Sequence, residues 1–505
     1  MRQRASHISI INTTFTAATG LLLYVLYAGE ILGERAAYTG LTLLLLTYLG
    51  IEVAKVRRVH PVRWAINPVV LGSFVTFAMG YGLTNALFFI PAEQLDLVGI
   101  FPEVTPAMVK LMGLVLVAAL AMWGGYWSPF AAKLTSPTVV ARTQTRFLPN
   151  VRLRTLTIPI LLLISAGSRL LQVKLGVFGY SSTYEQLIEL RSVTQYLSIG
   201  ASLGKLALVL AACRYFAANH KKSASKWFFF ALGLEVLWGF LSGFKSVVVM
   251  PFIIAAICQY LMTGKMSKQW FMFFIAGLVA AYAVIEPFRA ARNEDTGFRS
   301  TSLFAIGSTM WEALAKPPEA ADDSPSLIVA VASRSNLSYI GSFGVDFADA
   351  GMHGAPGDPD FLGNLLLAPA HAWIPRFLWD SKPLGTLGLW YNQTVLGLSH
   401  FSSTAMGPIT YLYFAGGVVA IIIGFWLIGA MQRILFFSLQ PWNSLSGTVV
   451  FFGILQTITI IDSAFNGVLV SLLRDLPLMI ILCFLIFARA RSGSFRYVAP
   501  SSVLR

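Results

Sequence analysis

Long apolar blocks dominate this sequence and limit what it can fold into. Each block runs for about 20 residues, the length that a helix needs to cross the hydrocarbon core of a bilayer. The blocks are continuous rather than periodic, so the sequence predicts an all-α polytopic membrane protein with about twelve transmembrane helices. The expected spans begin near Ile10, Ala37, Ala65, Met108, Leu156, Gln195, Trp227, Ser246, Trp270, Ile409, Leu445 and Pro477, with a start near Gly467 as the alternative for the last one.

The composition excludes several other classes of protein. Hydrophobic residues make up 56% of the chain and charged residues only 12%, about half of the roughly 25% that soluble domains carry. A disordered chain, a collagen and an ordinary soluble enzyme are therefore excluded. The three cysteines show no CxxC spacing, and there is no HExxH, EF-hand or Walker pattern, so we expect no disulfide framework, no metal and no cofactor.

The charged residues predict the orientation of the spans. The 37 Lys and Arg residues against 23 Asp and Glu residues give a net charge of +14. Cytoplasmic loops of membrane proteins are rich in Lys and Arg, so most of this excess needs no nucleic acid to explain it. With a cytoplasmic N-terminus, the loops after even-numbered spans are the basic ones, and an even number of spans places both termini in the cytoplasm. These loops hold Lys55, Arg57, Arg58, Arg63, Lys133, Arg142, Arg146, Arg152, Arg214, Lys221, Lys222, Lys226, Lys265, Lys268 and Arg433.

The positions of the expected spans divide the chain into three segments. Residues 1–287 form spans one to nine, residues 288–405 form one large external loop, and residues 406–505 form the last three spans and a cytoplasmic tail. Within the loop, residues 361–379 and 384–398 are apolar and aromatic. We expect them to form short interfacial or re-entrant helices that lie against the spans.

Basic residues in this external loop are the first candidates for function. In the stretch Pro375-Arg376-Phe-Leu-Trp379-Asp-Ser-Lys382-Pro383, an indole lies between two cations. Arginine binds phosphate oxygens in a bidentate way, lysine adds a point charge, and the indole suits a headgroup-level anchor or a sugar face. The alternative is an interfacial anchor with snorkelling cations.

Further candidates flank the ninth span. Arg289 and Arg292 share one helical face if the helix continues, which would make an anion clamp, and Arg334 lies farther along the loop. The alternative is that these arginines pair with Glu294 and Asp295.

Ionisable residues inside spans are costly and are functional candidates by default. An internal ion pair, for example between Lys205 and Glu235, is the structural alternative. The residues concerned are Arg169, Lys205, Glu235, Lys245, Arg474 and Asp475.

Three histidines, His353, His371 and His400, fall in the external loop. Histidine is a natural general base near neutral pH. His400, between an expected re-entrant helix and the tenth span, is the candidate base, although each of the three is also compatible with an ordinary loop position.

With these residues, the chain resembles the Wzy-type oligosaccharide repeat-unit polymerases, the family that assembles bacterial O-antigen, capsule and exopolysaccharide. The resemblance rests on topology and on sparse motifs. After the loop, the family's acidic residue is missing, so its role cannot be carried over. The matching stretches are Pro375 to Pro383, Ser242-Gly243-Phe244-Lys245-Ser246, Asn67-Pro68, and Gly407 with Tyr411, Tyr413 and Gly416.

The resemblance implies a GT-C-type glycosyltransferase that moves a growing glycan from undecaprenyl diphosphate to a new lipid-linked repeat. The implied partners are undecaprenyl-diphosphate-linked oligosaccharide and the bilayer, with a chain-length regulator as an optional one. The implied place is the bacterial inner membrane, with the active site on the periplasmic side. Developing charge on the diphosphate calls for cations. The expected site residues are Arg289, Arg292, Arg334, Arg376, Lys382, Lys245, Trp379 and Tyr413 for diphosphate and substrate, and Arg376 with His400 for catalysis.

Two other functions stay open. An O-antigen ligase shares the topology and the donor but delivers the glycan to a lipid A core. A lipid-linked oligosaccharide flippase or another secondary transporter predicts two related halves and no large external loop. This sequence shows no related halves and has a large expected loop, so both features argue against a transporter.

Overall fold

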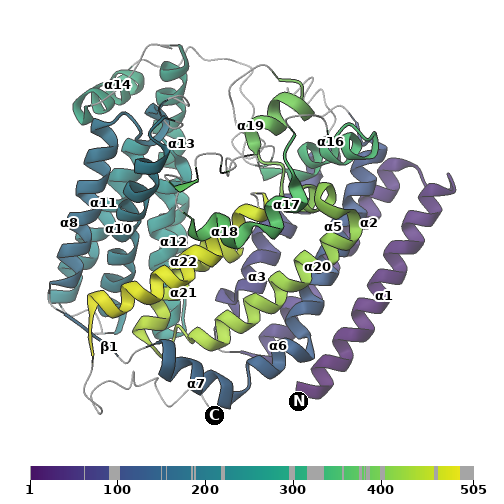
Figure 1. Cartoon of the computed structure of the whole chain (residues 1–505), viewed down its shortest axis with the longest axis horizontal. Coiled ribbons are helices and arrows are strands. Elements are labelled where there is room, and N and C mark those ends of the chain that lie inside the picture. The colour runs from purple at the N-terminus through teal and green to yellow at the C-terminus, as the bar shows by residue number, and fades with distance from the viewer. Residues whose placement is uncertain are drawn as a thin grey trace. The chain divides into compact units, whose positions relative to one another are not determined.

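The computed structural model is helical almost throughout its regular structure (Figure 1). The structure describes residues 2–61, 63–89, 103–148, 151–154, 156–182, 186, 189–217, 222–294, 302–315, 332, 335–354, 358–374, 378–379, 382, 387–398, 404–459 and 464–489. The chain forms two compact units. Unit 1 consists of Met1–Phe147, Asp323–Gln440 and Ile454–Leu478, and unit 2 of Leu148–Asp322, Pro441–Gly453 and Met479–Arg505.

Eleven helices in the described residues are long and apolar enough to cross a membrane. The predicted fold class, an all-α polytopic membrane protein, is thereby confirmed. The described part of the eleventh expected span is the apolar helix α21 (Leu445–Thr459), which has 15 residues. The last helix, α22 (Phe465–Ile486), starts close to the alternative position near Gly467.

Unit 1 holds the first four expected spans, the tenth expected span and short helices of the expected external loop. Its elements are α1 (Arg2–Ala28), α2 (Glu34–Val59), η1 (Trp64–Ile66), α3 (Pro68–Gly72), the π-helix η2 (Ser73–Met79), η3 (Leu83–Phe89), α5 (Pro106–Trp127), α6 (Pro129–Leu134), α7 (Pro137–Phe147), α16 (Leu337–Asp349), α17 (Phe361–Leu366), α18 (Ala368–Trp373), α19 (Gly388–Trp390), the π-helix η6 (Tyr391–Val395) and α20 (Pro408–Leu439), with parts of α21 and α22.

The core of unit 1 is built on α5 and α20. Thr105 caps α5 by accepting a hydrogen bond from the Met108 amide, and Pro106 fits the first turn, where no amide donor is needed. A Cβ atom added at Gly125 would overlap the Trp426 carbonyl, and one added at Gly429 would overlap the Met122 carbonyl. These glycines let the two backbones touch, as small residues do between membrane helices.

The contacts also fix the direction of these helices. The residues near the start of α5 face the start of α20, because the ammonium of Lys110 lies 5.2 Å from the ring centroid of Tyr413. The glycine contacts join the end of α5 to residues farther along α20. The helices are therefore parallel, which agrees with an even number of steps between the fourth and the tenth expected spans.

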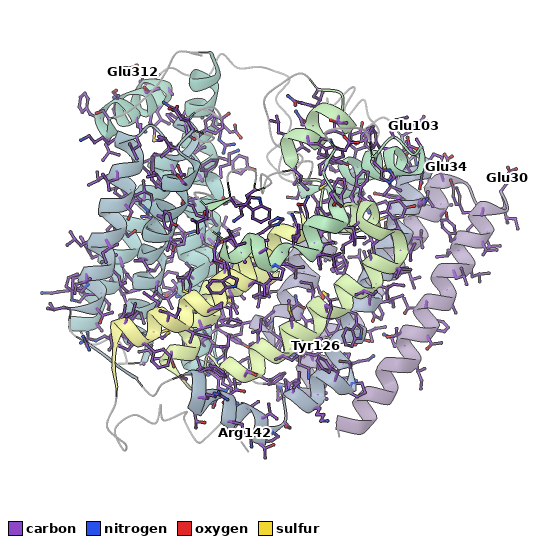
Figure 2. All side chains as sticks on the ribbon, viewed as in Figure 1. Glu30, Glu34, Glu103, Tyr126, Arg142 and Glu312 are labelled. Atoms are coloured by element: carbon purple, nitrogen blue, oxygen red, sulfur yellow. The ribbon has the colours of Figure 1, made fainter. Side chains whose placement is uncertain are left out.

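Three acidic residues and one arginine of unit 1 lie at opposite ends of its helices. Figure 2 places Glu30, Glu34 and Glu103 at one end of this unit and Arg142 at the opposite end. In the prediction from the sequence, the loops with Glu34 and Glu103 are external and the loop with Arg142 is cytoplasmic.

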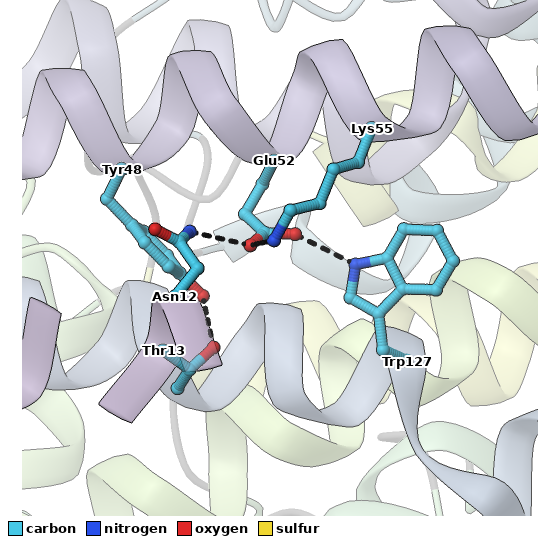
Figure 3. A network of polar contacts seen from close by, with 6 residues as sticks. All are labelled: Asn12, Thr13, Tyr48, Glu52, Lys55 and Trp127. Atoms are coloured by element: carbon cyan, nitrogen blue, oxygen red, sulfur yellow. Dashed lines mark hydrogen bonds and ion pairs between the residues drawn. The ribbon is translucent and has the colours of Figure 1, made fainter. Parts of the chain in front are cut away.

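A buried polar network joins α1, α2 and α5 (Figure 3). Glu52 has no exposed surface. Its carboxylate accepts hydrogen bonds from Asn12 at 2.9 Å and from the Trp127 indole at 3.0 Å, and pairs with Lys55 at 2.6 Å. Because each contact satisfies the buried charge, this network holds the three helices together.

Unit 2 is a second group of helices. Its elements are β1 (Val151–Leu153), α8 (Thr157–Lys174), η4 (Gly179–Ser181), α10 (Arg191–Ala217), α11 (Lys222–Ser242), α12 (Lys245–Thr263), α13 (Lys268–Glu294), α14 (Leu303–Ala315) and β2 (Phe487–Arg489), with the remaining parts of α21 and α22. The two strands pair in antiparallel fashion, with Val151 opposite Arg489 and Leu153 opposite Phe487.

Glu235 inside unit 2 pairs with Arg169 rather than with Lys205. Nη1 and Nη2 of Arg169 each lie 2.8 Å from a different carboxylate oxygen of Glu235. The side chains are only 7% and 1% exposed. The planar guanidinium offers two parallel donors to the carboxylate, which a single ammonium cannot do.

The described part of the expected external loop contains short helices. Residues 361–379 were expected to be helical, and α17 and α18 occupy 361–373 with a break at Leu367. In the second stretch, helical structure covers residues 388–395. Leu366 and Trp373 are 73% and 55% exposed, and the position of these helices at a membrane interface stays a prediction.

Candidate functional site

The junction between α11 and α12 is a candidate site in unit 2. The backbone of Gly243 has φ +69°, and a Cβ there would lie 2.9 Å from Cε1 of Phe288. Only glycine takes this conformation and this space without strain. The chain can therefore end α11 at Ser242 and begin α12 at Lys245 two residues after the turn.

Arg289, a predicted site residue, lies at this junction. Its Nε donates a hydrogen bond to the carbonyl oxygen of Gly243 at 2.9 Å. Its guanidinium carbon is 4.6 Å from the ring centroid of Tyr180 and 5.6 Å from that of Phe244. This hydrogen bond and the two aromatic rings together hold the guanidinium at the start of α12.

Lys245 lies at the same junction and is only 11% exposed. It forms an ion pair with Glu286, one turn before Arg289 on α13, and its ammonium lies 3.5 Å from the ring centroid of Tyr282. The structure thus brings together two cations that the sequence analysis selected separately, and it adds a carboxylate that shares the charge of Lys245.

Two predicted residues of the loop motif meet the end of α18 in unit 1. The ammonium of Lys382 donates to the carbonyl oxygen of Ile374 at 2.9 Å. The Trp379 ring lies 5.2 Å from the ring of His371, a residue only 7% exposed. The described part of this motif therefore folds back on the helix before it.

Tyr413 belongs to a different cluster of unit 1. Its hydroxyl donates to Oδ1 of Asp349 at 2.7 Å, and the ammonium of Lys110 lies 2.5 Å from Oδ2 of the same carboxylate. The side chains of Lys110 and Asp349 are 33% and 39% exposed. Carboxylates are among the side chains that act as general bases in enzymes, and this one is partly exposed to solvent.

Four predicted residues cannot be placed in any of these three clusters. Arg334, Arg376 and His400 lie outside the described residues. Arg292 lies in α13, but its side chain is also outside the described part.

Asp349 and Lys110 were missed by sequence reasoning. Lys110 is an ionisable residue four positions into an apolar span, which was a usable signal. Asp349 ends α16 just before a glycine-rich turn and offered no signal of its own. Among the residues that the structure describes, no group of three His, Cys, Asp or Glu side chains could hold a metal ion.

The fold and these clusters define an all-α polytopic membrane protein whose described helix ends carry cations beside aromatic rings. Comparison of the chain with family models, with curated proteins and with solved structures finds no match in any of the three.

Proposed function

We propose that this protein is a lipid-diphosphate-dependent glycosyltransferase that polymerises undecaprenyl-diphosphate-linked oligosaccharide repeat units for O-antigen, capsule or exopolysaccharide. In this proposal it lies in a bacterial inner membrane with both termini in the cytoplasm and reacts on the periplasmic side. The motifs that resemble Wzy-type polymerases support the proposal, and an O-antigen ligase is its nearest rival.

The observation that carries the proposal is the position of Arg289. The Ser242 to Ser246 motif and the arginine after the ninth span were selected independently in the sequence. Their direct contact, from Nε of Arg289 to the Gly243 carbonyl, is the arrangement expected if both serve one anionic substrate.

The chemistry needs two kinds of group. The acceptor hydroxyl attacks the anomeric carbon of the growing glycan, a new carbon–oxygen bond forms, and the bond to the diphosphate breaks with its electron pair leaving on undecaprenyl diphosphate. In the proposal, Arg289 and Lys245 stabilise the charge that develops on the diphosphate. The hydroxyl proton passes to a base, for which Asp349 joins His400 as a candidate.

The remaining predicted residues keep their proposed roles. Arg292, Arg334, Arg376 and Lys382 would bind the diphosphate, Trp379 would stack on a sugar, and Tyr413, which donates a hydrogen bond to Asp349, would contact the substrate. A bidentate arginine and a stacked indole suit a phosphate group and a sugar face respectively.

A deletion strain complemented with variants tests this function. The deletion should accumulate single lipid-linked repeats, and the wild-type gene should restore long polymer. Arg289→Ala should restore none, although the protein is inserted at normal levels, whereas Arg214→Ala, an exposed arginine on α10, should act like wild type. Accumulation of long lipid-linked glycan in the deletion strain would indicate a ligase. Repeats retained on the cytoplasmic face would indicate a transporter. Either result would refute a polymerase.

A further inference from the structure

Unit 2 contains an open apolar groove of about 490 Å³ where α8 begins and α22 ends. The Thr157 hydroxyl donates to the Ile486 carbonyl at 3.3 Å and so joins the two helices at the groove. Among its lining residues, Leu156, Ile160 and Leu485 are 65%, 50% and 69% exposed. Such exposed apolar walls on membrane-spanning helices face hydrocarbon, so an apolar chain fits the groove better than water does.

Arginine residues flank the ends of this groove in the chain. Arg154 lines it directly. The antiparallel pairing of β1 and β2 places the backbone of Arg152 opposite Ala488 and that of Arg489 opposite Val151, so three arginines lie within a few residues of the groove. The sequence has no Asp or Glu between Glu103 and Glu185, and none after Asp475.

We propose that this groove is a binding site for an anionic phospholipid. One acyl chain would lie along the apolar wall, and the headgroup phosphate would bind Arg154. Basic residues at the end of a membrane helix attract anionic lipids, and a guanidinium binds phosphate oxygens through paired hydrogen bonds. The absence of acidic side chains in both segments of sequence favours an anionic headgroup over a zwitterionic one. This site is independent of the proposed enzymatic activity.

Native mass spectrometry of the delipidated full-length protein tests the site. We expect phosphatidylglycerol to bind more tightly than phosphatidylcholine of the same chain length. Arg154→Gln should weaken the phosphatidylglycerol binding by about tenfold, the effect of one lost charge-assisted contact. Ile160→Trp should weaken it as well, because the larger ring fills the groove while every charge remains.

Two matched controls separate a site from a general surface effect. Arg142→Gln removes the same charge from the exposed helix α7, and Leu163→Trp adds the same ring to an exposed position of α8 outside the lining. Both should bind phosphatidylglycerol like wild type. Equal binding of the two lipids, unchanged binding in Arg154→Gln, or an equal loss in Arg142→Gln would overturn the proposal.

Discussion

Arg289 donates a hydrogen bond from Nε to the carbonyl oxygen of Gly243, 2.9 Å away. A side chain of α13 thus binds the backbone of the turn between α11 and α12. This contact depends on the left-handed conformation of Gly243. A change in the turn would therefore also move the guanidinium of Arg289.

Gly243→Ala should therefore lower stability and activity together. A left-handed conformation costs a non-glycine residue about 1–2 kcal/mol, and the new methyl group would lie 2.9 Å from the Phe288 ring. We expect a lower apparent melting temperature in detergent and loss of long polymer in cells. Gly233→Ala is the control, because no atom outside its own stretch of helix backbone lies within 4 Å of a Cβ at that position. A Gly243→Ala protein as stable and as active as wild type would contradict the role given to this turn.

Asp349→Asn should lower activity without lowering stability. The pair with Lys110 is partly exposed, and such pairs contribute about 0–1 kcal/mol to stability. A neutral amide cannot take up the acceptor's proton, so we expect little or no polymer from normally inserted protein. Tyr413→Phe removes only one hydrogen bond to the carboxylate and should keep partial activity. Full polymer length from Asp349→Asn would remove this residue from the proposed chemistry.

Glu235→Leu should destabilise unit 2 strongly. The substitution leaves Arg169 charged and buried without its carboxylate, and breaking one side of a buried pair costs about 3–5 kcal/mol. The double variant Arg169→Met with Glu235→Leu should recover most of the loss, because it removes both charges. Apparent melting temperatures of the three proteins measure the effect. A single variant as stable as wild type, or a double variant no better than the single one, would show that the pair is not a stability element.

The spans could be predicted from the sequence because the physical rule is local. A run of about 20 apolar residues is stable in lipid only as a helix that satisfies its own backbone. The rule does not predict local irregularities inside a span, such as residues 68–79, where α3 continues as a π-helix. Such local irregularities depend on packing partners that lie far away in the sequence.

The site was predictable only in part. Lys245 and Arg289 were selected from residue type and position, and the structure brings them to one turn. Their contacts with Glu286 and Tyr180 follow from helix packing, which the sequence does not reveal. The pairing of Glu235 with Arg169 instead of Lys205 has the same origin, since all three residues are plausible partners in a linear sequence.

The most direct test of the proposed function is a reaction with purified components. The full-length protein in lipid nanodiscs is incubated with single undecaprenyl-diphosphate-linked repeats extracted from the deletion strain, and the products are separated by size. We predict a ladder of longer glycans and the release of undecaprenyl diphosphate with wild type, and neither product with Arg289→Ala. Unchanged single repeats with the wild-type protein, or an equal ladder with Arg289→Ala, would contradict the account.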